Sequence, residues 1–212
     1  MCRYYLEIAK QYKMFRSFKK KSIKIVIIGD GAVGKTSYVD KFINEEKDDF
    51  RFKKNYNATT GCNVYVSDCL VNGKETKLHI FDTAGQEKFG SLRDSYVMGA
   101  DGVILMYDIT NIASKNNVIK RWLPNIRKIF SENGFYNVPI IVVGNKLDIR
   151  KKCEPGKSYV FRQCNLDAGY KNFGSIEQCL ISVKSGENLM NPLEHLLKKI
   201  FSSWWDINIV RQ

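Results

Sequence analysis

The sequence is poor in the features that mark membrane, secreted or disordered proteins. It has only four prolines and 15 glycines among 212 residues, and 44% of its residues are hydrophobic, so global disorder is not expected. No apolar run reaches the ~20 residues that a transmembrane helix needs, and the basic N-terminus lacks the continuous apolar block of a secretory signal. We therefore expect an intracellular protein with a packed core.

Signatures of zinc sites and disulfide frameworks are missing as well. The sequence contains no C-x-x-C pair, and neither of its two histidines, His79 and His195, lies where it would suggest a zinc site with a cysteine. We interpret the cysteines as reduced thiols that mainly serve packing, and we expect structural roles for both histidines. The six cysteines are Cys2, Cys62, Cys69, Cys153, Cys164 and Cys179.

Acidic residues are scarce relative to basic ones. The 34 lysines and arginines outnumber the 22 aspartates and glutamates, which gives a net charge of +12. Such a surface attracts nucleic acid, anionic lipid or acidic proteins, and charge alone does not choose among them. Because zinc-finger spacing and an aromatic RNA-binding signature are both missing, nucleic acid is the least favoured of these partners.

Residues 1–21 form a basic N-terminal extension. Its apolar residues recur at helical spacing, and basic residues fill much of the remainder. One interpretation is an amphipathic segment at an anionic membrane surface. The other is an extra helix or a disordered tail. The apolar stripe consists of Tyr4, Ile8, Tyr12, Phe15 and Phe18.

The remaining chain alternates short apolar runs with helical patterns. Apolar runs of this kind, without polar alternation, are typical of strands buried on both faces of a parallel sheet. The predicted strands are 23–28, 103–107, 138–143 and 178–181, with a hairpin of 62–71 and 76–82 that turns at Asn72-Gly73; the predicted helices are about 115–131 and 189–203. This order predicts an α/β fold: a doubly wound, mostly parallel six-stranded sheet with helices on both faces. We place one domain at 22–203 and a short C-terminal tail at 204–212.

The first apolar run leads directly into a phosphate-binding motif. The stretch Gly29-Asp30-Gly31-Ala32-Val33-Gly34-Lys35-Thr36 fits G-x-x-x-x-G-K-[ST], and Ser37 follows it. Glycines let backbone N–H groups curl around phosphate oxygens, and the next helix presents its N-terminus to the same anion. Lys35 supplies positive charge to the β- and γ-phosphates, while the Thr36 hydroxyl coordinates Mg²⁺. The motif indicates a P-loop NTPase.

A second strand ends in a candidate metal and water site. Asp82, at the end of Leu78–Asp82, is the expected acidic partner of the Mg²⁺ shell. Gly85 can bring a backbone N–H against the γ-phosphate without crowding it. Gln86 follows and is placed to orient the attacking water, so we assign it the catalytic role.

The stretch from Asp82 to Asp94 resembles the second switch of the Ras superfamily, nearest to its Ran and Rab branches, and the resemblance covers roughly 23–201. It implies a small GTPase that switches between GTP-bound and GDP-bound states with Mg²⁺. Ala58-Thr59-Thr60-Gly61 is similar to the first switch, with Thr59 as the metal-binding threonine and Thr60 as its competitor. Phe52, or alternatively Phe50, corresponds to the aromatic beside the guanine. The loop over 44–51 is several residues longer than in Ran-like proteins.

Guanine specificity is indicated by Asn145-Lys146-Leu147-Asp148, which follows another predicted strand. Asp148 can accept hydrogen bonds from N1–H and the amino group of guanine, a donor pair that adenine lacks. The Lys146 stem can cover the base, and Asn145 is expected to tie the loop to the P-loop. Ser182-Val183-Lys184 resembles the last base-contacting loop of the family, with valine where alanine is usual.

The resemblance also implies regulators and partners. Arg51 and Arg93 are more simply explained as surface residues than as catalytic arginines, so slow hydrolysis and an activating protein are expected, together with an exchange factor and effectors. Rab-like vesicle traffic and Ran-like transport both remain open. A C-terminal prenylation motif is missing, and we expect a monomer in the cytoplasm, nucleus or at a membrane surface. The alternatives are a non-hydrolysing nucleotide-bound scaffold and an ATP-dependent enzyme.

Overall fold

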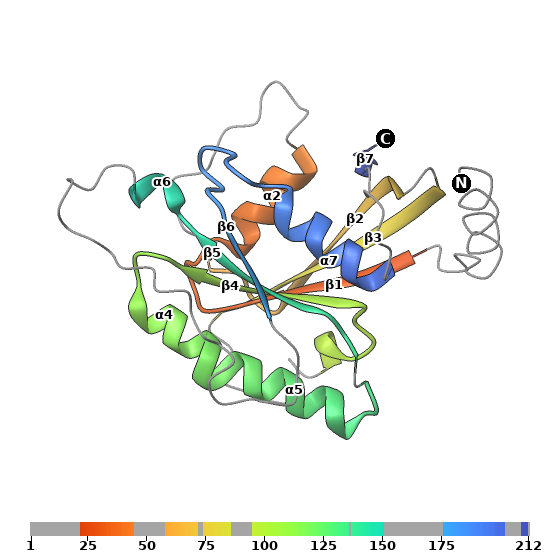
Figure 1. The fold of residues 1–212 in the computed structure, drawn as a ribbon, viewed down its shortest axis with the longest axis horizontal. Coiled ribbons are helices and arrows are strands. Elements are labelled where there is room, and N and C mark those ends of the chain that lie inside the picture. The colour runs from red at the N-terminus through yellow and green to blue at the C-terminus, as the bar shows by residue number, and fades with distance from the viewer. Residues whose placement is uncertain are drawn as a thin grey trace, which may run out of the picture.

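The computed structural model describes residues 22–44, 58–71, 74–85, 95–135, 137–150, 176–201 and 209–211. Within these stretches the strands form one sheet with the order β6-β5-β4-β1-β3-β2-β7 (Figure 1). The strands are β1 (Ser22–Ile28), β2 (Cys62–Val71), β3 (Lys74–Thr83), β4 (Gly102–Asp108), β5 (Ile140–Asn145), β6 (Glu177–Leu180) and β7 (Ile209–Arg211). The helices are α2 (Lys35–Asn44), α4 (Ile112–Asn117), the π-helical turn η1 (Val118–Trp122), α5 (Leu123–Glu132), α6 (Leu147–Arg150) and α7 (Asn191–Phe201).

The predicted six-stranded, mostly parallel sheet is confirmed, and β7 extends it. Neighbouring strands among β3, β1, β4, β5 and β6 pair in parallel, whereas β2 runs antiparallel to β3. Every residue of β4 is buried. These parallel strands are apolar without alternation because helices cover both faces of the sheet.

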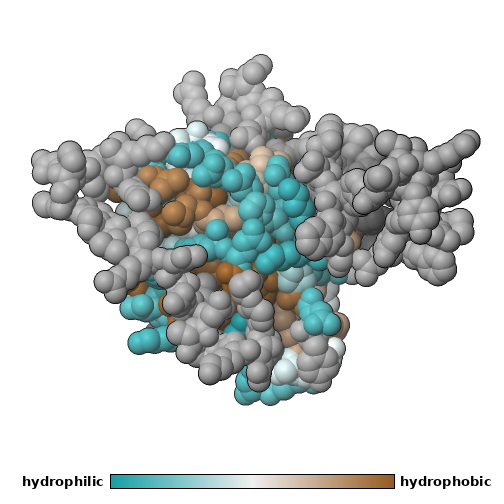
Figure 2. Space-filling model, viewed as in Figure 1, coloured by the Kyte–Doolittle hydropathy of each residue, from teal (hydrophilic) through white to brown (hydrophobic). Residues whose placement is uncertain are grey.

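Two helical layers enclose the sheet. The side chains of Ile23, Ile25 and Ile27 pack in a core with α2 and α7, whereas Val26 and Ile28 pack in a second core with η1 and α5. Figure 1 shows α2 and α7 on one side of the sheet and α4 and α5 on the other. In Figure 2 hydrophilic side chains cover the outer side of α7, as expected of an amphipathic surface helix.

Element boundaries differ from the prediction in three places. The helix predicted over 115–131 begins at Ile112 and contains the π-helical turn. The apolar periodicity did not predict this start, because Ile112 is 69% exposed and does not belong to the buried stripe. The helix begins there because Asn111 caps it by accepting hydrogen bonds from two backbone N–H groups. β5 continues to Asn145 rather than ending at 143. Residues 202 and 203 of the second predicted helix lie outside the described residues.

The third difference lies at the C-terminus. Residues assigned to a short tail include β7, which pairs antiparallel with Cys69–Val71 at the edge of β2. A strand of three residues is too short to show a periodic pattern, and its partner strand lies far away in the sequence, so β7 could not be predicted.

None of the helices in the described stretches combines the length and apolarity needed to cross a membrane.

Candidate functional site

The phosphate-loop motif lies between the end of β1 and the start of α2. Its lysine, Lys35, is only 6% exposed. The Lys35 Nζ donates hydrogen bonds to the carbonyl oxygens of Gly29 at 2.9 Å and Asp30 at 2.8 Å. The ammonium group is thus held inside the curl of the loop, at the N-terminus of a ten-residue helix. This combination of a buried cation and a helix N-terminus favours an anionic ligand.

Burial also affects the protonation of Lys35. It lowers the pKa of this ammonium group to about 8, although the nearby carboxylates of Asp82 and Asp30 act in the opposite direction. A polyanion bound in the loop would add negative charge beside Lys35 and so favour its charged form. Phosphate binding and protonation of Lys35 therefore reinforce one another.

Two glycines are required by their surroundings. Gly34 has φ +103°, and a Cβ there would lie 2.3 Å from Nδ2 of Asn145. A Cβ on Gly85 would lie 2.3 Å from the backbone nitrogen of Gly31 and 2.5 Å from the carbonyl oxygen of Asp30. These contacts are too short for any side chain, so the loop after β3 packs directly on the phosphate loop.

Oxygen ligands gather next to the phosphate loop. The Thr36 Oγ1 donates to Asp82 Oδ2 at 2.6 Å and lies 2.9 Å from the Thr59 Oγ1. Asp82 is fully buried, and its other oxygen, Oδ1, has no hydrogen-bond partner. Burial raises the pKa of this carboxyl group, although the Thr36 hydrogen bond and Lys35 lower it.

These oxygens fit Mg²⁺, which prefers hard oxygen ligands and binds few protein carboxylates. A cation would satisfy Asp82 Oδ1, whose burial without a partner is otherwise unfavourable. Among the described residues, no three His, Cys, Asp or Glu side chains form a metal-binding group. The fit therefore depends on the hydroxyls of Thr36 and Thr59 beside a single carboxylate.

The candidate base site is joined to the phosphate loop through Asn145. Its Nδ2 donates to the carbonyl oxygen of Val33 at 2.9 Å, and its Oδ1 accepts from the backbone N–H of Val183 at 3.0 Å. The Ser182 hydroxyl donates to Asp148 Oδ1 at 2.7 Å. Three segments that are distant in sequence thus share one hydrogen-bonded unit.

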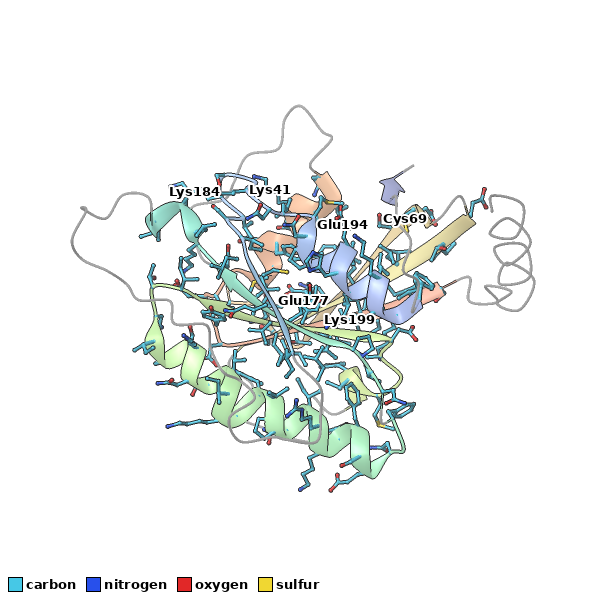
Figure 3. The ribbon with its side chains drawn as sticks, in the orientation of Figure 1. Lys41, Cys69, Glu177, Lys184, Glu194 and Lys199 are labelled. Atoms are coloured by element: carbon cyan, nitrogen blue, oxygen red, sulfur yellow. The ribbon has the colours of Figure 1, made fainter. Side chains whose placement is uncertain are left out.

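A further contact links α2 to this unit. Figure 3 shows Lys41 of α2 and Lys184 of the loop after β6 at the same end of the molecule. The Lys41 Nζ donates to the carbonyl oxygen of Lys184 at 3.3 Å. Both ends of the candidate site therefore contact α2, which starts at the phosphate loop.

Residues 24–202 match the family described as the Ras family. The chain belongs to the Ras family. It is also 36% identical over 182 residues to the Ras and EF-hand domain-containing protein of Xenopus tropicalis, a match that covers 85% of this chain and 24% of the relative. The chain thus spans about a quarter of the length of that relative.

The Ras-family site brings most of the predicted residues together. Thr59 reaches Thr36, whereas Thr60 is exposed. Ser37 lies in the first turn of α2. Several predictions fall outside the described residues: the catalytic Gln86, the aromatic Phe52 or Phe50, the arginines Arg51 and Arg93, and the extension 1–21.

Sequence reasoning missed Asp108, which ends β4 opposite Asn145 of β5 in this Ras-family site. Its Oδ2 lies 2.7 Å from Nζ of Lys146, a residue with φ +73°. Burial raises the pKa of Asp108, but the hydrogen bonds from Lys146 and Thr110 outweigh it, so the pKa is lowered overall. An acid at the carboxyl end of a buried parallel strand was the available signal, because ligands bind at that edge.

Proposed function

We propose that this Ras-family chain is a molecular switch that binds GTP or GDP with Mg²⁺ and slowly hydrolyses GTP to GDP. The observation that carries the proposal is the buried, unpartnered Asp82 Oδ1 beside the hydroxyls of Thr36 and Thr59. These three groups lie next to Lys35, so cation and phosphate ligands would occupy one continuous site.

The phosphate loop would hold the β- and γ-phosphates. Its backbone N–H groups and the Lys35 ammonium would neutralise and orient the phosphate oxygens. The oxygens of Thr36, Thr59 and Asp82 would hold Mg²⁺, which when bound would supply positive charge against the negative charge that develops during phosphoryl transfer. Thr59 belongs to the segment that would stay in place only while the γ-phosphate is present, and its release would report hydrolysis.

The base loop, which contains Asp148, would select guanine. Ser182 donates to one oxygen of Asp148 and so orients the carboxylate. The carboxylate would accept from N1–H and the exocyclic amino group of guanine. Adenine would leave a carboxylate oxygen without these donors, which disfavours ATP. Asn145 joins the base loop to the phosphate loop, so the sites for the base and for the phosphates would keep a fixed separation.

Hydrolysis would depend on Gln86, which directly follows Gly85 in the sequence. Because Gly85 packs on the backbone of Asp30 and Gly31, the chain leaves this point beside the phosphate loop. Gln86 would orient the attacking water there. Turnover would be slow, ~10⁻⁴–10⁻³ s⁻¹ as for unstimulated Ras, and an activating protein would accelerate it.

Single-turnover phosphate release tests this proposal. Protein loaded with GTP and Mg²⁺ should release phosphate slowly, and Gln86→Leu should bind GTP as before but hydrolyse it at least about tenfold more slowly. Unchanged hydrolysis in the variant would refute the role of Gln86. A wild-type chain that binds GTP and releases no phosphate would instead indicate a non-hydrolysing scaffold.

The pathway is proposed from local resemblance. The segment Glu87–Tyr96 is similar to Ran, whereas Tyr107–Thr110 is similar to Rab. We infer a role in vesicle traffic or nuclear transport, served by an exchange factor, an activating protein and effectors and carried out by a monomer inside the cell. Imaging of the tagged full chain would separate these pathways, since vesicles and the nuclear envelope are distinct destinations.

Membrane contact is proposed for residues 1–21. Residues 1–24 carry eight basic residues and one acidic residue, and the apolar stripe described above would face the lipid. Co-sedimentation with anionic vesicles should be lost when residues 1–21 are removed. Equal binding by the full and the shortened chain would end this idea.

A further inference from the structure

The side chain of Asp30, within the phosphate loop, is held by one distant helical segment. Its Oδ2 accepts a hydrogen bond from Asn117 Nδ2 at 2.6 Å, and its Oδ1 accepts one from Trp122 Nε1 at 2.7 Å. Hydrogen bonds to a carboxylate are stronger than those between neutral groups. We refer to Asp30, Asn117 and Trp122 as the Asp30 cluster.

The π-helical turn explains how both donors reach one carboxylate. Asn117 and Trp122 are five residues apart, which in a regular α-helix places them about 140° apart around the axis. The turn η1 starts directly after Asn117 and ends at Trp122, and the backbone N–H of Leu123 bonds to the carbonyl of Val118 in the wider i→i+5 pattern. This turn brings residues five apart toward the same side. Such turns occur frequently at functional sites.

The cluster is anchored in the core. Trp122 is 1% exposed and packs in the apolar cluster that includes Val26 and Ile28 of β1. Its ring therefore cannot move without disturbing the layer beneath the sheet. The donor end of the cluster is fixed by the fold, and the acceptor end is part of the phosphate loop.

The backbone of Asp30 contributes directly to the candidate site. Its carbonyl oxygen accepts from Lys35 Nζ at 2.8 Å, and Gly85 packs against the same peptide group. A shift of Asp30 would therefore displace the lysine that faces the phosphates and the start of the segment that contains Gln86. The hydrogen bonds to the Asp30 side chain oppose such a shift.

We propose that Asn117 and Trp122 are positioning residues that hold the phosphate loop in its nucleotide-binding form through Asp30, and so slow the release of bound nucleotide. The inference rests on the proposed function, since it assigns regulation of the same site. It differs from a merely structural role because the effect is specific to the phosphate end of the ligand.

The test is the rate at which a fluorescent GDP analogue leaves the Mg²⁺-loaded chain after addition of excess GDP. Asn117→Ala should release it about tenfold faster, which corresponds to about 1.4 kcal/mol. Asn116→Ala is the matched control, because Asn116 is the preceding residue of α4 and is exposed. The ratio of GDP to inosine diphosphate affinity should stay unchanged in both variants, since the base loop is untouched.

A reciprocal exchange strengthens the test. Asn117→Asp alone should speed release, because its carboxylate would then face the carboxylate of Asp30, and neither group has a proton to donate. When Asp30→Asn is combined with Asn117→Asp, the new amide at position 30 can donate to the new carboxylate at position 117 while its oxygen accepts from Trp122. Release should then return to within about threefold of the unchanged chain.

Three results would overturn the inference. Unchanged release from Asn117→Ala would remove the positioning role, as would a double variant that releases the analogue as fast as the single variants. A fall in the GDP to inosine diphosphate ratio would show a general collapse of the site. Failure of the unchanged chain to bind GDP would instead overturn the proposed function itself, and the positioning role with it.

Discussion

At the scale of single residues, the orientation of Asp148 depends on one hydroxyl. Ser182, which is fully buried, donates to Asp148 Oδ1 and accepts from the backbone N–H of Ser185. A hydroxyl with both a donor and an acceptor role is fixed in place. The carboxylate of Asp148 therefore has a defined edge to present to a base.

Exchanging that carboxylate for an amide should change the preferred base. Asp148→Asn presents one donor and one acceptor, which match the carbonyl and N–H of xanthine instead of the two donors of guanine. We expect the preference for guanosine over xanthosine diphosphate to fall by at least about tenfold in equilibrium competition.

Asp68→Asn is the control for this change, because Asp68 is an exposed strand residue paired with Lys77. It should leave base preference as it is. If Asp148→Asn keeps full selectivity for the guanosine nucleotide, the assignment of Asp148 to the base is wrong.

Site residues could be predicted from the sequence only where their chemistry is local. The phosphate loop and the Asn145–Asp148 stretch are each continuous, so their spacing alone predicts their function. Asp30 and Asn117 lie 87 residues apart, and no local pattern reports their contact. Asp108 carried a local signal, its place at the end of a buried strand, but its contact with Lys146 forms only when β4 and β5 pair.

At the scale of elements, α7 packs on the sheet through a tight fit with β4. Leu196 is fully buried, and a Cβ on Gly102 would lie 2.9 Å from its side chain. The helix can approach this closely only because Gly102 has no side chain. On the β6 side of the interface, Lys199 and His195 of α7 contact Glu177 at 3.3 and 2.5 Å, and Figure 3 shows Glu177 beside Lys199.

Removal of the leucine should loosen this interface. Leu196→Ala is expected to lower the free energy of unfolding by about 2–5 kcal/mol, because it deletes buried methyl groups and leaves a cavity. Denaturant titration measures the loss. Lys198→Ala, two residues further along and partly exposed, should change the free energy by no more than about 0.5 kcal/mol. A Leu196→Ala variant as stable as this control would show that the packing is misassigned.

Elements could be predicted where burial leaves a regular pattern in their own residues. The buried strands were found because continuous apolar runs need cover on both faces. The leucine stripe of α7 was found because it repeats with helical spacing. The π-helical turn and β7 were not found, because the contacts that accompany them, Asp30 for the turn and the edge of β2 for the strand, are distant in sequence.

At the scale of the whole molecule, the site lies at β1, the point where the strand order of the sheet reverses. β1 pairs with β3 on one side and with β4 on the other, so successive crossovers leave it in opposite directions. Ligands of doubly wound sheets bind at such a point, outside the carboxyl ends of the strands. The phosphate loop follows β1, the proposed Mg²⁺ ligand Asp82 lies in β3, and the base-contacting loops follow β5 and β6. The described phosphate, metal and base residues therefore all lie at the carboxyl ends of the parallel strands.

The most direct measurement is an equilibrium titration of the purified, nucleotide-stripped full chain with a fluorescent GDP analogue. With Mg²⁺ present, we predict saturable binding to one site, full competition by GTP and GDP, and none by the same concentration of ATP. Chelation of Mg²⁺ should weaken the binding. A chain that shows no saturable binding, or that ATP competes for as well as GTP does, would contradict the account.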